Sequence, residues 1–359
     1  MKKQKLVLVG NGMAGMKVIE ELLTIAPDLY DITVFGAEPY GNYNRIMLSP
    51  LLAGEKTLDD IMLNDVEWYA QNGITLHTGK EVVEIDRWGR RVIAADGTSV
   101  EYARLLLATG SSPFIIPVPG KDLPGVLSYR DVHDVEAMVD ASTRYRKAVV
   151  IGGGLLGLEA AYGLMKPSME VTVVHLMDTL MARQLDKPAG RMLQHSLEAR
   201  GMRFRMEAQT QEIIGDERVE AVRFADGSEE AADLVIMAAG IRPNTALAQK
   251  AGLYCERGIV VSDTLQTFDP KIYAVGECVQ HRGQCYGLVA PLFEQAKVCA
   301  NHLAGLGFSY YQGSVTSTKL KVTGIDLFSA GDFQSGDDRD EIVFQDPAVG
   351  IYKRIVVKG

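Results

Sequence analysis

The chain begins with a short apolar run that leads directly into a glycine-rich turn and a helical pattern. Leu6–Val9 are four successive apolar residues, and Gly10, Gly12 and Gly15 follow with the spacing G-x-G-x-x-G. The first glycine of such a pattern permits a tight turn, the second lets the backbone approach a pyrophosphate, and the third lets the helix pack closely on the strand. The spacing therefore predicts a strand, a phosphate-binding loop and a helix.

The residues after this loop complete a dinucleotide-binding pattern. Met13 and Ala14 open the helix, whose free N–H groups and positive dipole end favour a phosphate. A second strand is predicted at Ile32–Phe35, and Glu38 follows it, 23 residues after Gly15. An acid at about this distance binds the adenosine ribose in dinucleotide folds. A purely structural glycine turn is the alternative, but the order of strand, loop, helix, strand and acid favours a cofactor site.

The composition is that of a soluble globular protein. The chain has 359 residues, 47% hydrophobic and 23% charged, with a net charge of -9. This length predicts two or three domains, and the acidic balance favours neither nucleic acid nor an anionic membrane as a partner. Lys2, Lys3 and Lys5 before the first apolar run resemble a signal peptide, but the glycine loop interrupts that run. We therefore expect a cytoplasmic protein without a membrane span.

The cysteines indicate no redox or metal centre. Cys255, Cys278, Cys285 and Cys299 form neither C-x-x-C nor C-x-C pairs. Spacing of that kind is the usual signature of thiol-disulfide centres and of cysteine-ligated clusters. We interpret the four residues as reduced packing side chains and expect no metal site.

The segment between Glu38 and the next linker predicts several short elements. Arg45 is a candidate charge-assisted donor to the pyrophosphate, with a solvated surface charge as the alternative. Ala108, Thr109 and Gly110 end a buried strand, where small residues let the chain pass close to a cofactor. The predicted elements are a helix at 66–72, strands at 74–77 and 102–107, and a hairpin at 81–93 with its turn near Trp88.

A second strand-loop-helix unit follows a proline-rich linker at 115–125. Ala148–Ile151 are apolar, and Gly152, Gly154 and Gly157 repeat the G-x-G-x-x-G spacing 142 residues after the first copy. Leu155 and Leu156 open the second helix. Because chance matches rarely repeat with this context, two copies predict two dinucleotides or two halves of one electron path.

The strand of this second unit that corresponds to Ile32–Phe35 ends at His175. Asp178 lies slightly further on, and no pair of arginines is present to hold a 2′-phosphate. The pattern favours NADH over NADPH. An ordinary strand-end histidine is an equally good interpretation of His175.

The remainder of the chain predicts a return to the first unit and then a small strand-rich piece. A strand at 234–238 runs to Gly240, a strand near 272 ends at Gly276 and Glu277, and Pro291 suits the first turn of a helix at 293–303. The other predicted elements are a helix at 186–200, a hairpin formed by 204–214 and 219–224, and strands at 318–322, 326–330, 341–344 and 351–357.

These residues together resemble the two-dinucleotide-domain flavoprotein disulfide reductase superfamily over essentially the whole chain. The likeness rests on the two glycine loops, Ala108–Gly110, Glu159, Gly240 with Pro243 and Asn244, and Tyr273–Glu277. Within it, Tyr43–Ser49, Val173–Met181 and Leu320–Gly324 resemble the N-terminal flavin portion of NAD(P)H-dependent nitrite reductase large subunits.

The resemblance implies an α/β fold with two Rossmann-like domains, the second inserted in the first. It places FAD on residues 1–113 and 242–305, NAD(P)H on 114–241, and a truncated interface domain at 306–359. Glu277 would bind a ribityl hydroxyl, the helix near Pro291 would face the flavin pyrimidine, and Ser49 belongs to the cofactor-contacting stretch. Glu159 would be the catalytic residue facing nicotinamide and flavin. Related reductases pair it with a lysine, but that position is Pro50 here, so a raised pKa through desolvation is expected.

The leading functional hypothesis is an enzyme of nitrate assimilation that moves hydride from NADH to FAD and passes electrons to an iron–sulfur and sirohaem nitrite reductase centre. This chain has no cysteines for that centre, so we expect a fragment or a short relative. A stand-alone ferredoxin or rubredoxin reductase, an NADH oxidase and a non-catalytic flavin redox sensor are the alternatives. A homodimer is compatible with all of them.

Overall fold

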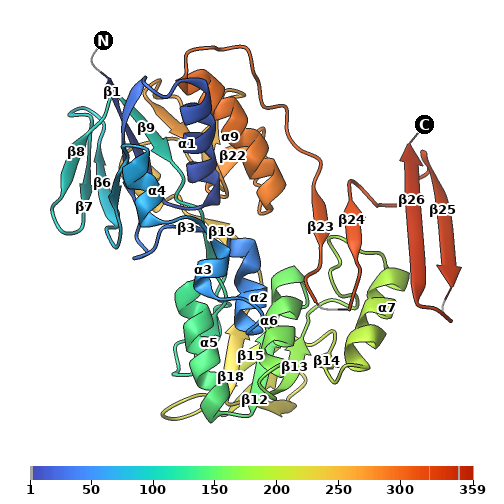
Figure 1. Ribbon diagram of the computed structural model, residues 1–359. Helices are drawn as coiled ribbons and strands as arrows, with labels where there is room; N and C mark the ends of the chain where they lie inside the picture. Colours follow the sequence, from blue (N-terminus) through green and yellow to red (C-terminus); the bar gives the residue numbers. More distant parts are fainter. Residues whose placement is uncertain (1–2, 323, 347, 359) are drawn as a thin grey trace. The chain divides into compact units, whose positions relative to one another are not determined.

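The computed structural model describes residues 3–322, 324–346 and 348–358, and its contacts divide the chain into two compact units (Figure 1). The first unit comprises Met1–Arg45, Leu58–Ser112 and Ile241–Thr316, and the second comprises Ile46–Thr57, Pro113–Gly240 and Ser317–Gly359. These bounds differ from the expected domains, because 46–57 and 317–359 belong to the second unit and 306–316 to the first. Lys2 and Thr323, both singled out in the sequence, lie outside the described residues.

A five-stranded parallel sheet forms the centre of the first unit. Its order is β21-β9-β1-β2-β5, so the strand before the first glycine loop is central. Leu6, Leu8 and Leu105–Leu107 are fully buried, as expected for parallel strands that are covered on both faces. Helices α1 and α9 lie side by side against this sheet (Figure 1). The bounds are β1 Gln4–Val9, β2 Tyr30–Phe35, β5 Thr75–His77, β9 Arg104–Leu107, β21 Ile272–Ala274, α1 Met13–Ile25 and α9 Val289–Leu303.

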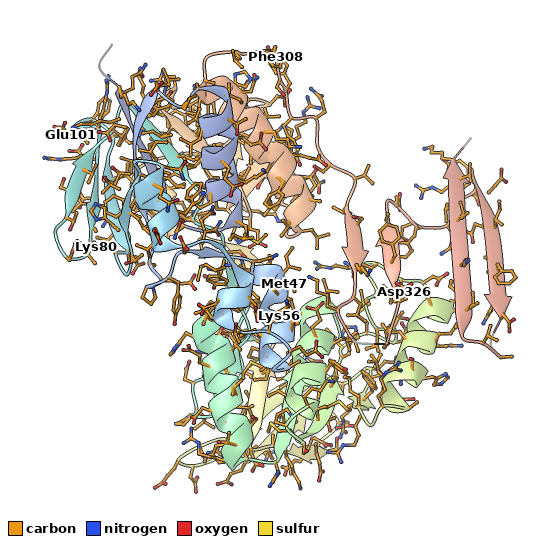
Figure 2. The ribbon with its side chains drawn as sticks, viewed as in Figure 1. Met47, Lys56, Lys80, Glu101, Phe308 and Asp326 are labelled. Atoms are coloured by element: carbon orange, nitrogen blue, oxygen red, sulfur yellow. The ribbon has the colours of Figure 1, made fainter. Side chains whose placement is uncertain are left out.

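Smaller elements complete the first unit. The predicted hairpin is present as two strands of an antiparallel meander, β6-β7-β8, and Trp88 at its turn is 93% exposed. Figure 2 labels Lys80 just before this meander and Glu101 at its end. The bounds are β3 Asn42–Tyr43, β4 Met62–Asn64, β6 Val82–Asp86, β7 Arg91–Ala94, β8 Ser99–Glu101, β10 Ser111–Pro113, β19 Ile241–Pro243, β20 Ile259–Val261, β22 Val279–His281, η1 Arg45–Met47, α3 Leu58–Ile61, α4 Val66–Gln71 and α8 Ala246–Lys250.

The second unit repeats this plan. Its parallel sheet has the order β11-β18-β12-β13-β14, with the strand before the second glycine loop at the centre, and an antiparallel meander follows β14 as the other follows β5. Met47 and Lys56, labelled in Figure 2, lie on either side of α2, which packs on α6. The bounds are β11 Val126–Ser128, β12 Lys147–Ile151, β13 Glu170–Val174, β14 Arg203–Arg205, β15 Thr210–Ile214, β16 Ala221–Phe224, β17 Glu229–Ala231, β18 Leu234–Met237, α2 Leu48–Leu52, α5 Val132–Arg144, α6 Leu155–Met165 and α7 Lys187–Glu198.

The C-terminal residues of the second unit form two antiparallel pairs. The sequence predicted all four strands, and the structure pairs β23 with β24 and β25 with β26. Within the described ranges, no helix has the length and apolar character needed to cross a bilayer. The bounds are β23 Ser317–Lys319, β24 Phe328–Ala330, β25 Arg339–Asp346 and β26 Ile351–Lys358.

Three predictions about secondary structure were incomplete or wrong. The single strand expected at 204–214 is divided between β14 of the parallel sheet and β15 of the meander, and the chain turns between them at Glu207, which has φ +52°. Helix α5 was missed, although the Asp131 side chain caps it by accepting from the Asp134 N–H. Helix α9 begins at Val289, four residues earlier than expected, so Pro291 is its third residue.

Candidate functional site

The first glycine loop combines two closed positions with one open position. Gly10 has φ +105°, and a Cβ there would collide with the carbonyl oxygen of Ala108. A Cβ on Gly15 would lie 2.9 Å from both the Ala108 Cβ and a Leu8 methyl group. At Gly12, in contrast, no described atom lies within 4 Å of the built Cβ. The fold itself therefore requires the outer glycines, and the middle one leaves room for a ligand to approach the backbone.

The second glycine loop has the same division of tasks. Gly152 has φ +130° and faces the carbonyl oxygen of Ala238, and a Cβ on Gly157 would collide with the Gly152 carbonyl oxygen. The built Cβ of Gly154 again has no described atom within 4 Å. Both loops stand at the carboxyl end of a central parallel strand, the edge at which open α/β sheets bind ligands.

The two helices that start at these loops, α1 and α6, lack side-chain caps, and so does α9. Among the residues that the structure describes, no side chain caps any of the three, and their first turns contain no acid. Helices α4, α5 and α7 are capped by Asp65, Asp131 and Asp186. The open helix starts leave N–H groups and a positive dipole end for an anion. The residues present thus fit a pyrophosphate at each glycine loop, near Met13 and Ala14 in one unit and near Leu155 and Leu156 in the other.

Glu38 and Arg45 form a local ion pair beyond the end of β2. Arg45 donates to one oxygen of the Glu38 carboxylate, and the Tyr43 hydroxyl donates to the other at 2.6 Å. The Arg45 guanidinium also lies 5.2 Å from the centre of the Tyr43 ring. The structure shows Arg45 in contact with Glu38, the acid predicted to meet the ribose, and the predicted contact of Arg45 with the pyrophosphate stays a prediction.

The strand ends around Ala108 and Glu277 come together in the first unit. The Thr109 hydroxyl donates to the Asn244 carbonyl at 2.8 Å, and Asn244 donates back to the Thr109 carbonyl at 2.9 Å. Glu277 accepts from the Ser111 hydroxyl at 2.7 Å. Because β21 lies beside β9, these groups share the carboxyl edge on which the first glycine loop stands. The chain passes from one unit to the other shortly after Gly110 and again after Gly240. These glycines have positive φ values of +67° and +125°.

Two residues that sequence reasoning missed hold this edge in place. Gln295 is fully buried in α9, and its Oε1 accepts from the Gly276 N–H at 2.9 Å. Ser111 fixes the Glu277 carboxylate. A buried amide on the apolar side of a helix is the available signal for Gln295, whereas nothing in the sequence distinguishes Ser111 from other strand-end serines.

Glu159 is the buried carboxylate of the second unit. The residue is only 4% exposed. Ser49 Oγ donates to its Oε2 at 2.5 Å, and the Lys321 backbone N–H donates to its Oε1 at 3.0 Å. Burial raises its pKa above the usual value, and the Ser49 hydrogen bond, the Lys321 N–H and the Lys321 charge oppose that rise. The raised pKa confirms the expectation from desolvation.

The structure supplies partners for Glu159, which the sequence left without its usual lysine. The Ser49 hydroxyl donates to Glu159 and accepts from Tyr129 at 3.0 Å, and contact of Ser49 with a cofactor stays a prediction. The missing lysine at Pro50 is partly replaced by Lys321, whose ammonium bonds the Ile46 carbonyl at 3.0 Å and whose charge favours the ionised Glu159.

His175 forms a hydrogen bond with the backbone of the second glycine loop. Its Nδ1 accepts from the Gly153 N–H at 3.1 Å, and its Nε2 lies 3.1 Å from the Thr179 carbonyl. Because a backbone N–H points at Nδ1, the proton must be on Nε2, and burial lowers the pKa of the ring. Both ring nitrogens therefore have partners within the protein, which is compatible with the ordinary strand-end histidine that the sequence left open, and a nucleotide contact by His175 stays a prediction.

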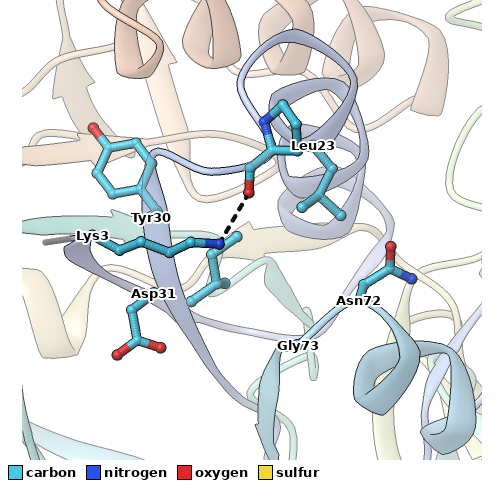
Figure 3. A pocket seen from close by; sticks show the side chains of 8 residues that line it. Lys3, Leu23, Tyr30, Asp31, Asn72 and Gly73 are labelled. Carbon is cyan, nitrogen blue, oxygen red and sulfur yellow. Dashed lines mark hydrogen bonds between the residues drawn. The ribbon is translucent and has the colours of Figure 1, made fainter. Parts of the chain in front are cut away.

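The cysteines and a surface hollow do not contribute to the candidate site. Burial raises the pKa of Cys278 and Cys299, which fits the packing role expected for them. Within the described ranges, no group of three or more His, Cys, Asp or Glu side chains could hold a metal ion. A surface hollow of about 280 Å³ lies elsewhere in the first unit. Figure 3 shows its lining side chains and the hydrogen bond that Lys3 donates to the Pro27 carbonyl. Tyr30 and Asp31 line it at the start of β2, the sheet edge opposite the glycine loop.

Comparisons with known proteins agree with this geometry. A model of the pyridine nucleotide-disulphide oxidoreductase family matches residues 4–302, and one of the rubredoxin NAD+ reductase C-terminal domain matches residues 317–359. A nitrite reductase [NAD(P)H] of Bacillus subtilis is 54% identical over 359 residues, covering 100% of this chain and 45% of that protein. An assimilatory nitrate reductase electron transfer subunit of the same organism is 48% identical, covering 99% and 46%.

A solved structure shows the same fold at similar length. The covalent putidaredoxin reductase–putidaredoxin complex contains a chain with a TM-score of 0.90 and 29% identity, covering 100% of this chain and 88% of that one. In contrast, the chain spans less than half the length of the two Bacillus relatives. The matched family model covers most of the residues, including both glycine loops, so the chain belongs to the pyridine nucleotide-disulphide oxidoreductase family and is an FAD-dependent NAD(P)H oxidoreductase.

Proposed function

We propose that this chain is the NADH-oxidising flavin portion of an enzyme that delivers electrons to an iron–sulfur and sirohaem nitrite reductase centre outside these residues. The observation that carries the proposal is the pair of equivalent glycine loops, each with an open middle glycine and an uncapped helix. The likeness to the nitrite reductase of Bacillus subtilis supports the choice of final acceptor.

In this proposal the first unit holds FAD. Gly12 and the start of α1 receive its pyrophosphate, Glu38 its adenosine ribose and Glu277 a ribityl hydroxyl. The start of α9, with Pro291 in its first turn, stabilises negative charge on the reduced ring. The remaining contacts proposed for FAD come from Gly10, Met13, Ala14, Gly15, Ala108, Thr109, Gly110 and Gly276.

The second unit holds NADH in the same manner. Gly154 and the start of α6 receive the pyrophosphate, and His175 keeps the loop in shape through Gly153. NADH is preferred over NADPH because no arginine pair follows Val174, and the nearby Lys187 is engaged with Asp178 at 2.6 Å. Gly152, Leu155, Leu156, Gly157 and Gly240 are the other residues proposed to contact the nucleotide.

The chemistry requires little of the protein beyond binding and orientation. Bound FAD would supply the chemistry, which is hydride acceptance from NADH and release of single electrons to the next centre. Glu159 contributes by accepting a hydrogen bond from the nicotinamide carboxamide, which orients the ring for transfer. Each carboxylate oxygen has two acceptor sites, so the bonds from Ser49 and Lys321 leave capacity for that contact.

A second candidate is supported by the nitrate reductase electron transfer subunit, which is 48% identical to this chain. Both candidates share the NADH and FAD steps and differ only in the acceptor. Electron transfer to a nitrate reductase partner, with none to a sirohaem centre, would favour this second candidate.

The experiment compares the rate of flavin reduction by NADH in a single turnover with steady-state turnover on ferricyanide and on a reconstituted sirohaem partner. The proposal predicts a yellow chain with one FAD, rapid bleaching by NADH, and turnover that matches the reduction rate. Bleaching that is far slower than a catalyst requires, with no turnover on either acceptor, would indicate a redox sensor.

A further inference from the structure

We propose that Ser49 and Tyr129 are positioning residues that hold the Glu159 carboxylate in one orientation for the nicotinamide carboxamide. This inference rests on the proposed function, because it gives the nucleotide site of the second unit a defined orienting network. Pro50 cannot pair with this glutamate, whose side-chain donor is the Ser49 hydroxyl, supported by Tyr129.

The three side chains form a directional chain of hydrogen bonds. Tyr129 is 4% exposed, and burial raises the pKa of its hydroxyl, which therefore keeps its proton. Its hydroxyl donates to Ser49 Oγ at 3.0 Å, so the Ser49 proton is free to point at Glu159 Oε2, 2.5 Å away. Since a hydroxyl that accepts a bond becomes a better donor, the two bonds reinforce each other.

The network joins segments that are far apart in the chain. Ser49 lies in α2, Tyr129 directly after β11, and Glu159 in α6, and α2 packs against both α5 and α6. The side chain of Glu159 can therefore be shifted only together with its neighbours. Glu159 retains two unused acceptor sites on the oxygens that these donors fix in direction.

The charged and titratable groups that act on Glu159 are few. Lys321 supplies an N–H at 3.0 Å and a positive charge, and Tyr129 interacts with the carboxylate through Ser49. Helix α2 has the sequence Leu-Ser-Pro-Leu-Leu and brings no charge. Among these groups the Ser49 hydrogen bond does most to lower the pKa of Glu159, and burial, which raises that pKa, has the larger effect.

A merely structural role for the hydroxyls is the competing interpretation, and buried hydroxyl pairs often serve only packing. Such a role would shift the titration of Glu159 when a hydroxyl is removed, but it would leave NAD+ binding and its pH dependence unchanged. The pH dependence of NAD+ binding, compared with the titration of Glu159, therefore separates the two interpretations.

The test uses the full chain labelled with ¹³C at glutamate side-chain carboxyls, with Glu159→Gln identifying the Glu159 signal. Ser49→Ala should raise the Glu159 pKa, Tyr129→Phe should raise it less, and Ser49→Thr should restore it. As the pH is lowered, protonation of Glu159 should weaken NAD+ binding. Titration calorimetry should show this loss beginning at a higher pH in Ser49→Ala than in Tyr129→Phe, and at a higher pH in Tyr129→Phe than in the unsubstituted chain. At neutral pH we expect NAD+ affinity to fall roughly ten-fold in Ser49→Ala and roughly three-fold in Tyr129→Phe.

Two matched variants control for the loss of a hydroxyl. Ser142→Ala removes a serine that is 5% exposed, like Ser49, and whose hydroxyl donates to the Val139 carbonyl of its own helix. Tyr162→Phe removes a hydroxyl from the helix that carries Glu159, on a residue whose ring lies near Lys166. Neither should move the Glu159 signal or NAD+ affinity.

An unchanged Glu159 titration in both Ser49→Ala and Tyr129→Phe would overturn the proposal, and so would a shifted titration without any change in NAD+ binding. Failure of the proposed function is distinguishable, because it would appear as absent FAD or absent NAD+ binding in the unsubstituted chain. The carboxyl titration can be read in that case as well.

Discussion

The two units of this protein have the same sheet order and the same glycine arrangement, yet they differ in the side chains around the loop. In the first unit an acid, Glu38, follows β2 and is oriented by Arg45 and Tyr43. In the second unit the corresponding strand ends at His175, whose ring nitrogens are used to support the loop. Helix α6 also carries a buried carboxylate, Glu159, in its second turn. Because the two loops have the same backbone arrangement, we expect the surrounding side chains to decide what each loop binds.

The largest expected effect comes from substituting the two open glycines separately. Gly12 and Gly154 have extended backbones, with φ -87° and -89°, and open space beside them. Valine fits both positions in the free protein, but its methyl groups would block a pyrophosphate. Gly12→Val should lose FAD, and Gly154→Val should keep FAD while its NAD+ affinity falls by roughly ten-fold or more. Flavin absorbance per chain, calorimetry with NAD+ and circular dichroism measure these outcomes.

These two variants are controls for each other. Equal loss of FAD in both would remove the distinction between the units, and undiminished flavin in Gly12→Val would defeat the assignment of FAD to the first loop.

The next effect concerns Glu159, which has no counterpart in the first unit. Glu159→Gln should retain FAD and slow flavin reduction by NADH roughly ten-fold, because a neutral amide oxygen accepts a weaker hydrogen bond from the nicotinamide carboxamide than a carboxylate does. Stopped-flow reduction at saturating and subsaturating NADH separates slower transfer from weaker binding. Wild-type values for both would leave Glu159 as an ordinary helix residue.

Glu159 should also affect the pH dependence of stability. Its pKa is raised in the folded protein, so the native state binds this proton more tightly than the unfolded chain. The associated stability is present below the unfolded pKa and is lost as pH rises through the folded pKa. As the pH rises from the unfolded to the folded pKa of Glu159, we therefore expect the free energy of unfolding to fall in the wild type but not, from this cause, in Glu159→Gln. Urea unfolding at a series of pH values measures this difference. Parallel pH curves would contradict this.

A smaller effect is expected from the loop-supporting histidine. The pKa of His175 is lowered by burial, so its contribution to stability is present above the usual histidine pKa and is lost as pH falls through the folded value. His175→Ala should weaken NAD+ binding by about 1 kcal/mol, the usual net value of one hydrogen bond, and leave FAD content unchanged. Calorimetry and flavin absorbance test this, and loss of FAD instead of NAD+ affinity would be the contrary result.

The smallest effect belongs to the Arg45–Glu38 pair. Both side chains are about one third exposed, at 28% and 31%, so the pair contributes less than about 1 kcal/mol. Arg45→Gln should weaken FAD binding only a few-fold, mainly by loosening Glu38. A loss of 100-fold in FAD affinity would instead indicate direct contact between Arg45 and the pyrophosphate.

The sequence was sufficient for the features that depend on neighbouring residues. Both strand-loop-helix units, their glycines and most parallel strands could be predicted, because burial on two faces demands apolar runs and the loop demands glycine at fixed spacing. The first glycine of each loop meets backbone atoms at the end of a neighbouring strand, and the third meets the carbonyl oxygen of the first. Structural features of this kind can be predicted because they depend on residues that are close together in the sequence.

The tertiary structure alone decided how distant polar groups pair. Ser49 and Glu159 are 110 positions apart, and Glu159 and Lys321 are 162 apart, so no spacing rule could connect them. The same holds for Ser111 with Glu277, and for the inclusion of 46–57 and 317–359 in the second unit. Burial made His175 a support of the loop and gave Glu159 hydroxyl and backbone partners in place of the absent lysine. These roles depend on which side chains folding brings within hydrogen-bond distance, and a linear pattern contains no measure of that distance.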